Sequence, residues 1–181
     1  MLRIPHTARG FSLTELMLVV AVGAILAGAS IPLTGQIVAT TKVNEAARLV
    51  EREFADARLR AVSSNRALRV RTNCPSAGFV RTVEVLNTAA DTATNRCLAS
   101  AYPFPPDDDL MTRPNYDGPV RVLPNQATVG TVTYQFAPDG TVFNVVANVA
   151  TRMATEQTVT ISRGTRSRLV RVNGAGKIQL Q

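Results

Sequence analysis

The chain has 181 residues, 45% of them apolar, and its 20 Lys and Arg against 13 Asp and Glu give a formal net charge of +7. This balance excludes a disordered polyelectrolyte and a multi-spanning membrane protein, and the length fits one domain with a short appendage. The excess of positive charge leaves nucleic acid and membrane surfaces open as partners until the charges are located.

An uncharged stretch at residues 16–41 dominates the N-terminal part, and its first section, 16–33, is almost purely apolar. As a helix, that section would be about 27 Å long, close to a hydrocarbon thickness of about 30 Å. A discarded secretory signal is the alternative, because the small residues 27–29 could mimic its cleavage site. However, Glu15 opens the stretch, where a secretory signal would carry Lys or Arg. We therefore expect a retained single membrane span.

The residues just before this stretch carry a more specific pattern. They read Arg9-Gly-Phe-Ser-Leu-Thr-Glu-Leu-Met17, so a short basic leader ends in glycine. This segment resembles the class III signal of type IV prepilins and type II secretion pseudopilins. The resemblance implies cleavage by prepilin peptidase between Gly10 and Phe11, N-methylation of Phe11, and retention of the apolar helix. It also implies that Glu15 pairs with a Phe11 amine during filament assembly; a carboxylate that merely reaches headgroup water is the alternative.

One long helix is predicted from about Phe11 to Ser63. Pro32 lies inside it and removes a backbone hydrogen bond, which predicts a kink or a locally melted turn. Further on, apolar residues recur at spacings of three and four, which predicts an amphipathic helix with one apolar face. The apolar face comprises Val43, Ala46, Ala47, Val50, Phe54, Ala57 and Ala61, and the polar face comprises Glu45, Arg48, Arg52, Asp56 and Arg60.

Beyond this helix the pattern changes to a period of two, which is typical of strands. Strands are predicted at residues 67–71, 79–86, 129–136, 141–149, 158–162, 168–172 and 177–180, and residues 87–119 are predicted to be irregular. Turn signals between the later strands predict successive antiparallel hairpins. The fold class is therefore α+β, with a long N-terminal transmembrane and amphipathic helix packed on an antiparallel β-sheet head.

The order of these elements resembles the GspH/FimT family of pseudopilins and minor pilins. Three segments carry the likeness: residues 55–62 at the helix end, Phe136-Ala-Pro-Asp-Gly140, and residues 169–173 followed by Gly176-Lys-Ile178. The resemblance divides the chain into a leader that is removed (1–10), a transmembrane segment (11–33), an amphipathic half-helix (34–63) and a β-rich periplasmic head (64–181).

The sequence offers few residues that could form a catalytic, cofactor or metal site. The single histidine, His6, lies in the leader, so the processed chain would lack histidine nucleophile partners and histidine metal ligands. Residues 174–177 resemble the end of a phosphate loop, but Arg171 and Ile178 break the pattern, which favours a hairpin turn. Residues 107–109 with Asp117 could ligate calcium, although a solvated loop is favoured. We expect no cofactor, no metal and no enzyme; an anchored periplasmic enzyme is the least favoured alternative.

Cys74 and Cys97 are the only cysteines, and both lie in the part of the chain that the resemblance places in the oxidising periplasm. A disulfide between them is predicted, and two free thiols are the alternative.

Most of the net charge gathers near the C-terminus, where residues 152–181 contain six basic residues and one acid. The FimT branch includes DNA-uptake pilins that bind DNA through a C-terminal Gly-Arg-x-Arg motif, and the nearest match here, residues 164–168, is one residue out of register. Arg163, Arg166, Arg168 and Arg171 are therefore candidate phosphate contacts. Solvated strand edges and subunit salt bridges are the alternative.

Together these patterns predict a non-enzymatic minor subunit, near the tip of a type II secretion pseudopilus or a type IV pilus. Its expected partners are other pseudopilins or minor pilins, prepilin peptidase and the inner-membrane assembly platform. The expected location is the bacterial inner membrane, spanned once with the N-terminus cytoplasmic and the head periplasmic, and then the filament. A DNA-binding minor pilin for natural transformation is the alternative.

Overall fold

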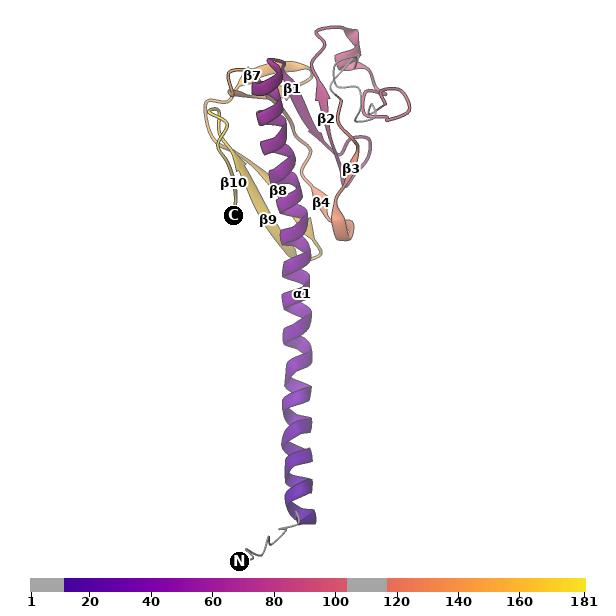
Figure 1. The fold of residues 1–181 in the computed structure, drawn as a ribbon, viewed down its shortest axis with the longest axis vertical. Helices are drawn as coiled ribbons and strands as arrows, with labels where there is room; N and C mark the ends of the chain where they lie inside the picture. Colours follow the sequence, from indigo (N-terminus) through magenta and orange to yellow (C-terminus); the bar gives the residue numbers. More distant parts are fainter. Residues whose placement is uncertain (1–11, 104–116) are drawn as a thin grey trace, which may run out of the picture. The chain divides into compact units, whose positions relative to one another are not determined.

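The computed structural model describes residues 12–103 and 117–181, without the side chains of residues 29–36. Helix α1 (Leu13–Ser64) comes first and is followed in these ranges by ten β-strands (Figure 1). The chain divides after Val38 into two compact units.

The N-terminal unit contains the first part of α1. Side chains from Ser12 to Gly28 are exposed, including the large apolar ones of Leu16, Met17 and Leu18. In the part of the chain that the structure describes, no helix is long and apolar enough to cross a membrane.

The second unit begins at Ala39 and contains the amphipathic part of α1. All seven residues of the predicted apolar face are buried, and all five of the predicted polar face are exposed. The helix ends at Ser64, after which Asn65 takes a left-handed conformation (φ 53°) and the Arg66 N–H donates to the Ala61 carbonyl at 3.1 Å. This is the Schellman arrangement, in which a left-handed residue satisfies the last carbonyls of a helix.

The strands form two antiparallel sheets. The first has six strands in the order β3-β2-β1-β5-β6-β7, and the second has four in the order β10-β9-β8-β4. In chain order the strands are β1 (Leu68–Thr72), β2 (Phe79–Glu84), β3 (Arg121–Val122), β4 (Thr128–Val129), β5 (Thr133–Phe136), β6 (Val142–Val146), β7 (Val149–Arg152), β8 (Gln157–Arg163), β9 (Arg166–Val172) and β10 (Ile178–Leu180). A helix on antiparallel sheets confirms the predicted α+β class.

Two of the predicted strands are wrong in extent. Residues 129–136 do not form one strand: β4 pairs with β8 in the second sheet, and after Gly130 the chain enters the first sheet as β5 beside β1. Residues 141–149 contain a turn at Ala147 and Asn148, both with positive φ (49° and 66°), and β7 follows as an edge strand. In both places alternation continues across a change of partner, so the pattern alone does not reveal the break.

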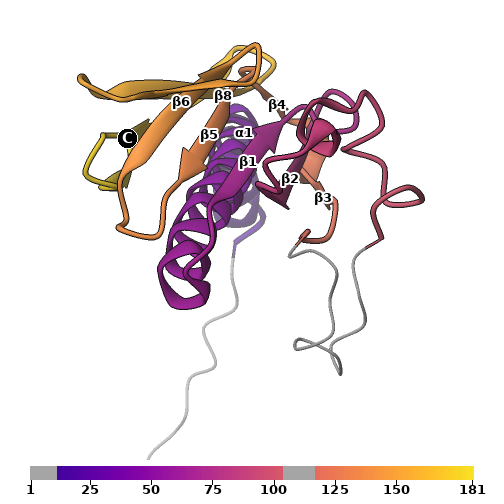
Figure 2. The same cartoon turned by 90° about the horizontal axis from the view of Figure 1, so that it is seen from above.

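The core lies between the head part of α1 and the two sheets. Seen from above, β6, β5, β1 and β2 form a row over this part of the helix (Figure 2). Phe54 packs against Tyr134 and Phe136, with ring centroids 5.5 and 6.3 Å apart. Tyr134 is buried in this cluster, and burial raises the pKa of its phenol to about 12.

The chain between β2 and β3, predicted to be irregular, is held by two buried arginines and a disulfide. The Arg96 guanidinium donates to both carboxylate oxygens of Asp117, and its Nη2 also donates to the Glu84 carbonyl at 3.0 Å. Arg81 Nε donates to the Gly118 carbonyl at 2.9 Å. Cys97, beside Arg96, is disulfide-bonded to Cys74 with the Cα atoms 5.2 Å apart.

Candidate functional site

The predicted processing site lies at the start of the chain. Gly10 and Phe11 are outside the described residues. Ser12 precedes α1, and its hydroxyl accepts a hydrogen bond from the Glu15 N–H at 3.2 Å. Glu15 is therefore an exposed residue in a capped first turn, where the helix dipole favours a negative charge. Its pairing with a Phe11 amine stays a prediction.

Pro32 lies within α1, which continues to Ser64. Its side chain is outside the described residues, so the kink expected there also stays a prediction.

Arg58 joins the three segments on which the family resemblance rests. From the end of α1, its Nε donates to the Gly140 carbonyl at 3.4 Å and its Nη2 donates to the Ala175 carbonyl at 3.3 Å. Gly140 closes the turn before β6, and Ala175 lies in the turn before β10. One side chain therefore ties the helix to both sheets through their turns.

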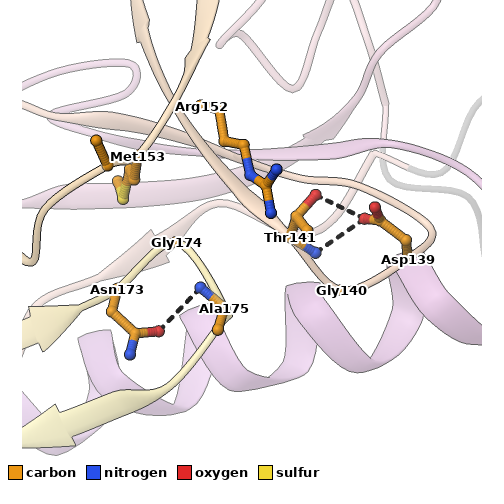
Figure 3. Close-up of a pocket in the computed structure, with 9 residues that line it drawn as sticks. Asp139, Gly140, Thr141, Arg152, Met153, Asn173, Gly174 and Ala175 are labelled. Atoms are coloured by element: carbon orange, nitrogen blue, oxygen red, sulfur yellow. Dashed lines mark hydrogen bonds between the residues drawn. The ribbon is translucent and has the colours of Figure 1, made fainter.

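The same two turns border an open pocket of about 740 Å³ (Figure 3). Its lining comes from three segments, namely residues 139–141, 152–154 and 173–175. Asp139 Oδ1 accepts hydrogen bonds from the Thr141 hydroxyl at 2.6 Å and from the Thr141 N–H at 2.9 Å. These bonds hold the pKa of the Asp139 carboxyl below its usual value.

The pocket offers limited chemistry. It presents one carboxylate, already engaged by its own turn, and the guanidinium of Arg152, with backbone groups of Gly174 and Ala175 beside them (Figure 3). An acid–base pair would need two titratable groups with separated pKa values. Among the residues that the structure describes, no group of three or more His, Cys, Asp or Glu could hold a metal ion. Asp107–Asp109 lie outside those residues, and Asp117 is bound by Arg96.

The structure separates the four candidate arginines of the β8–β9 hairpin. Register places Arg163 opposite Arg166, and Arg168 opposite the buried Ile161, so these three side chains lie on the face of the sheet that packs on α1. Arg171 lies on the other face and forms an ion pair with Glu156 at 3.0 Å.

Two arginines on the helix-facing side are anchored within the molecule. Arg163 Nε donates to the Asn125 carbonyl and Arg168 Nε donates to Asn44 Oδ1, each at 2.6 Å. Arg166 is exposed. The structure therefore places three of the four arginines on one face of the sheet and Arg171 on the other.

Sequence reasoning missed the structural arginines. Arg58 lies in residues 55–62, one of the segments of the family resemblance. Its hydrogen-bond partners, however, are backbone carbonyl groups, which every residue type carries and which the sequence therefore cannot identify. Neither Arg81 in β2 nor Arg96 in the irregular segment had a signal in the sequence, because an arginine is normally expected at the surface.

Comparison with known proteins gives a match at the N-terminus. Residues 5–31 match the family model described as the prokaryotic N-terminal methylation motif. No curated protein matches the chain.

Among solved structures, the chain is similar to the type IV minor pilin FimU of Pseudomonas aeruginosa in two crystal forms. In one, the TM-score is 0.45 at 18% identity, covering 76% of this chain and 91% of FimU. In the other, it is 0.47 at 18% identity, covering 78% and 89%.

The prepilin-type signal expected from residues 9–17 is confirmed by the motif match. The motif leads into a helix whose second part packs on antiparallel sheets. Both findings agree with the resemblance to prepilins and pseudopilins that residues 9–17 carry.

Proposed function

We propose that the chain is a non-enzymatic minor subunit of a type IV pilus or of a type II secretion pseudopilus. The observation that carries the proposal is the methylation motif at residues 5–31, which continues directly into α1. A subunit of this kind needs an N-terminal helix for anchoring and packing and a head for contacts with neighbours. The exposed apolar side chains of residues 16–28 and the separate core of the head suit these two tasks.

In this proposal, prepilin peptidase removes residues 1–10, and Phe11 becomes the methylated N-terminus. Residues 11–33 anchor the precursor in the inner membrane with the head in the periplasm, and later pack among neighbouring helices on the assembly platform. Glu15, held in the capped first turn, meets the amine of a neighbouring subunit. The head then contacts other minor subunits near the tip.

The test is processing of the full chain in cells with and without prepilin peptidase. Intact-mass spectrometry should show loss of residues 1–10 and a methylated Phe11 only when the peptidase is present. Gly10→Val should abolish cleavage, whereas Ala8→Val, a matched change two residues earlier, should leave it intact. Equal cleavage without the peptidase, or none with it, would contradict the proposal.

A DNA-binding minor pilin is the second candidate. It is favoured by the common face of Arg163, Arg166 and Arg168, since guanidinium groups bind phosphates without reading sequence. It is not favoured by Arg171, which faces away beside Glu156, or by the sequence after Phe143, which lacks an aromatic residue for base stacking.

A further inference from the structure

Four basic residues gather at one end of the head, and we call them the basic end. Arg163, Arg166 and Arg168 belong to the β8–β9 hairpin, and Lys42 belongs to the first turns of α1 in the second unit. Glu45 is the acidic residue on the neighbouring turn of α1, and it accepts a hydrogen bond from Asn125 Nδ2 at 3.0 Å. Among these five described residues, the four cations exceed the one acid by three charges.

The level of this end along α1 follows from three contacts. The Ala175 carbonyl accepts from Arg58. The Leu180 N–H donates to Glu51 Oε1 at 3.2 Å, and Leu180 is paired with Val170. Arg168 then reaches Asn44. The helix residues in these contacts are 58, 51 and 44, so each contact lies seven residues closer to the N-terminus of α1 than the one before. Strand β9, followed from Val172 back to Arg166, therefore runs toward the N-terminal end of the head part of α1.

Arg166 lies two residues beyond Arg168, which adds about 6.6 Å along an extended strand. That distance corresponds to about four helix residues at 1.5 Å each, so Arg166 reaches the level of about Thr40. Figure 1 shows the β8–β9 turn at this end of the head, beside α1.

The chain length to the apolar stretch is short. Leu33 ends that stretch, and Thr40 lies only seven positions after it. These span about 10 Å as helix, and at most about 25 Å if fully extended. A bilayer adds about 5–7 Å of headgroup region outside each side of its hydrocarbon core. The basic end is therefore tethered within reach of the headgroups of any bilayer that holds residues 16–33.

We propose that the basic end binds the anionic phospholipid surface of the membrane in which the chain is anchored. The inference rests on the proposed function, because it requires residues 16–33 to be in that membrane. Its contacts would be between guanidinium or ammonium groups and lipid phosphates, which need no specific pocket. Arg163 and Arg168 are held at Nε by Asn125 and Asn44, so their charges are fixed at this end without folding around a ligand.

Lipid fits the observations better than nucleic acid. The tether keeps an anionic bilayer permanently beside these charges, whereas DNA must arrive from solution, and an aromatic platform for bases is missing from the sequence after Phe143. While the subunit waits for assembly, lipid contact would hold the head against the membrane surface.

The test uses the full processed chain reconstituted in phosphatidylcholine vesicles with and without phosphatidylglycerol. A dye attached to the Thr165→Cys variant reports whether the β8–β9 turn contacts lipid headgroups. Labelling is selective for this position because Cys74 and Cys97 are engaged in the disulfide. Quenching by spin-labelled headgroups should be strong only in the anionic vesicles and should fall at high salt. Arg166→Gln should lower the equilibrium constant between the lipid-bound and the free head about fivefold, and Arg166→Lys should preserve it.

Arg152→Gln is the matched control, because Arg152 is exposed and lines the pocket near the other turns, far from this end. It should leave quenching unchanged. Resistance to alkaline extraction scores anchoring separately. A chain extracted from both vesicles contradicts the proposed function and the inference with it. An anchored chain that is quenched equally in both kinds of vesicle, or one that is not quenched in the anionic vesicles but whose dye responds to added duplex DNA, overturns the lipid proposal alone.

Discussion

Gly176 shows how tightly the turn before β10 is fitted against Arg58. Its φ is +80°, and a Cβ there would lie 2.6 Å from the Gly140 carbonyl oxygen and would collide with the Arg58 guanidinium. Gly140 also has a φ of +80°, and it provides the carbonyl that Arg58 binds. Glycine at both positions therefore allows three segments to meet at one side chain.

Gly176→Ala should destabilise the head by several kcal/mol, since both the backbone conformation and the Arg58 contact are lost. Gly164→Ala is the matched control, because Gly164 also has a positive φ (59°) but has open space around it. That control should cost only about 1 kcal/mol. Urea unfolding of both variants measures the difference, and equal losses would show that Arg58 imposes no steric constraint.

Single residues also show what sequence could not predict. The sequence makes Asp117 a candidate calcium ligand, yet its carboxylate binds Arg96 inside the protein. The pairing joins residues 21 positions apart through a segment without periodicity. Since burial of a charge depends on what folds over it, no local pattern could reveal either partner.

Among the elements, α1 is the best predicted and the strands are less so. The seven residues of its apolar face are buried because a spacing of three and four is a property of the helix itself. The switch of residues 128–136 between two sheets depends instead on which strand lies alongside, β8 or β1. The turn between β6 and β7 was also missed, because Ala147 carries an unusual positive φ for its residue type.

The segment between β2 and β3 should depend strongly on the Cys74–Cys97 bond. The bond closes a loop with a sequence separation of 23. Replacing both cysteines by serine should lower the free energy of unfolding by about 3 kcal/mol.

Chemical unfolding with and without reductant is the measurement. Reductant should destabilise the native chain by a similar amount and should have no effect on the double serine variant, which serves as the control. A native chain insensitive to reductant would contradict the expectation.

For the whole molecule, the division after Val38 has a direct consequence. Among the side chains that the structure describes, the buried apolar ones, from Val43 to Val172, all lie in the second unit. A chain that begins at Ala39 should therefore fold with the stability of the full chain, as measured by circular dichroism during urea unfolding.

A chain that begins at Glu51 provides the contrast. It lacks Val43, Ala46, Ala47 and Val50, four buried residues of the helix face, and it should not fold cooperatively. If the Ala39 chain also fails to fold, the head depends on the N-terminal segment, contrary to the division of the core.

Arg58 and Glu51 bind the turn before β10 and β10 itself, and these contacts can form only late in the synthesis of the chain. A growing chain exposes the apolar face of α1 long before β9 and β10 exist, since their residues are made last among those described. Until then Arg58 lacks the Ala175 carbonyl, one of its two carbonyl partners, and Glu51 lacks the Leu180 N–H. The helix is thus synthesised first and its covering is completed only by the last strands, so part of its apolar face needs protection from aggregation until synthesis is nearly complete.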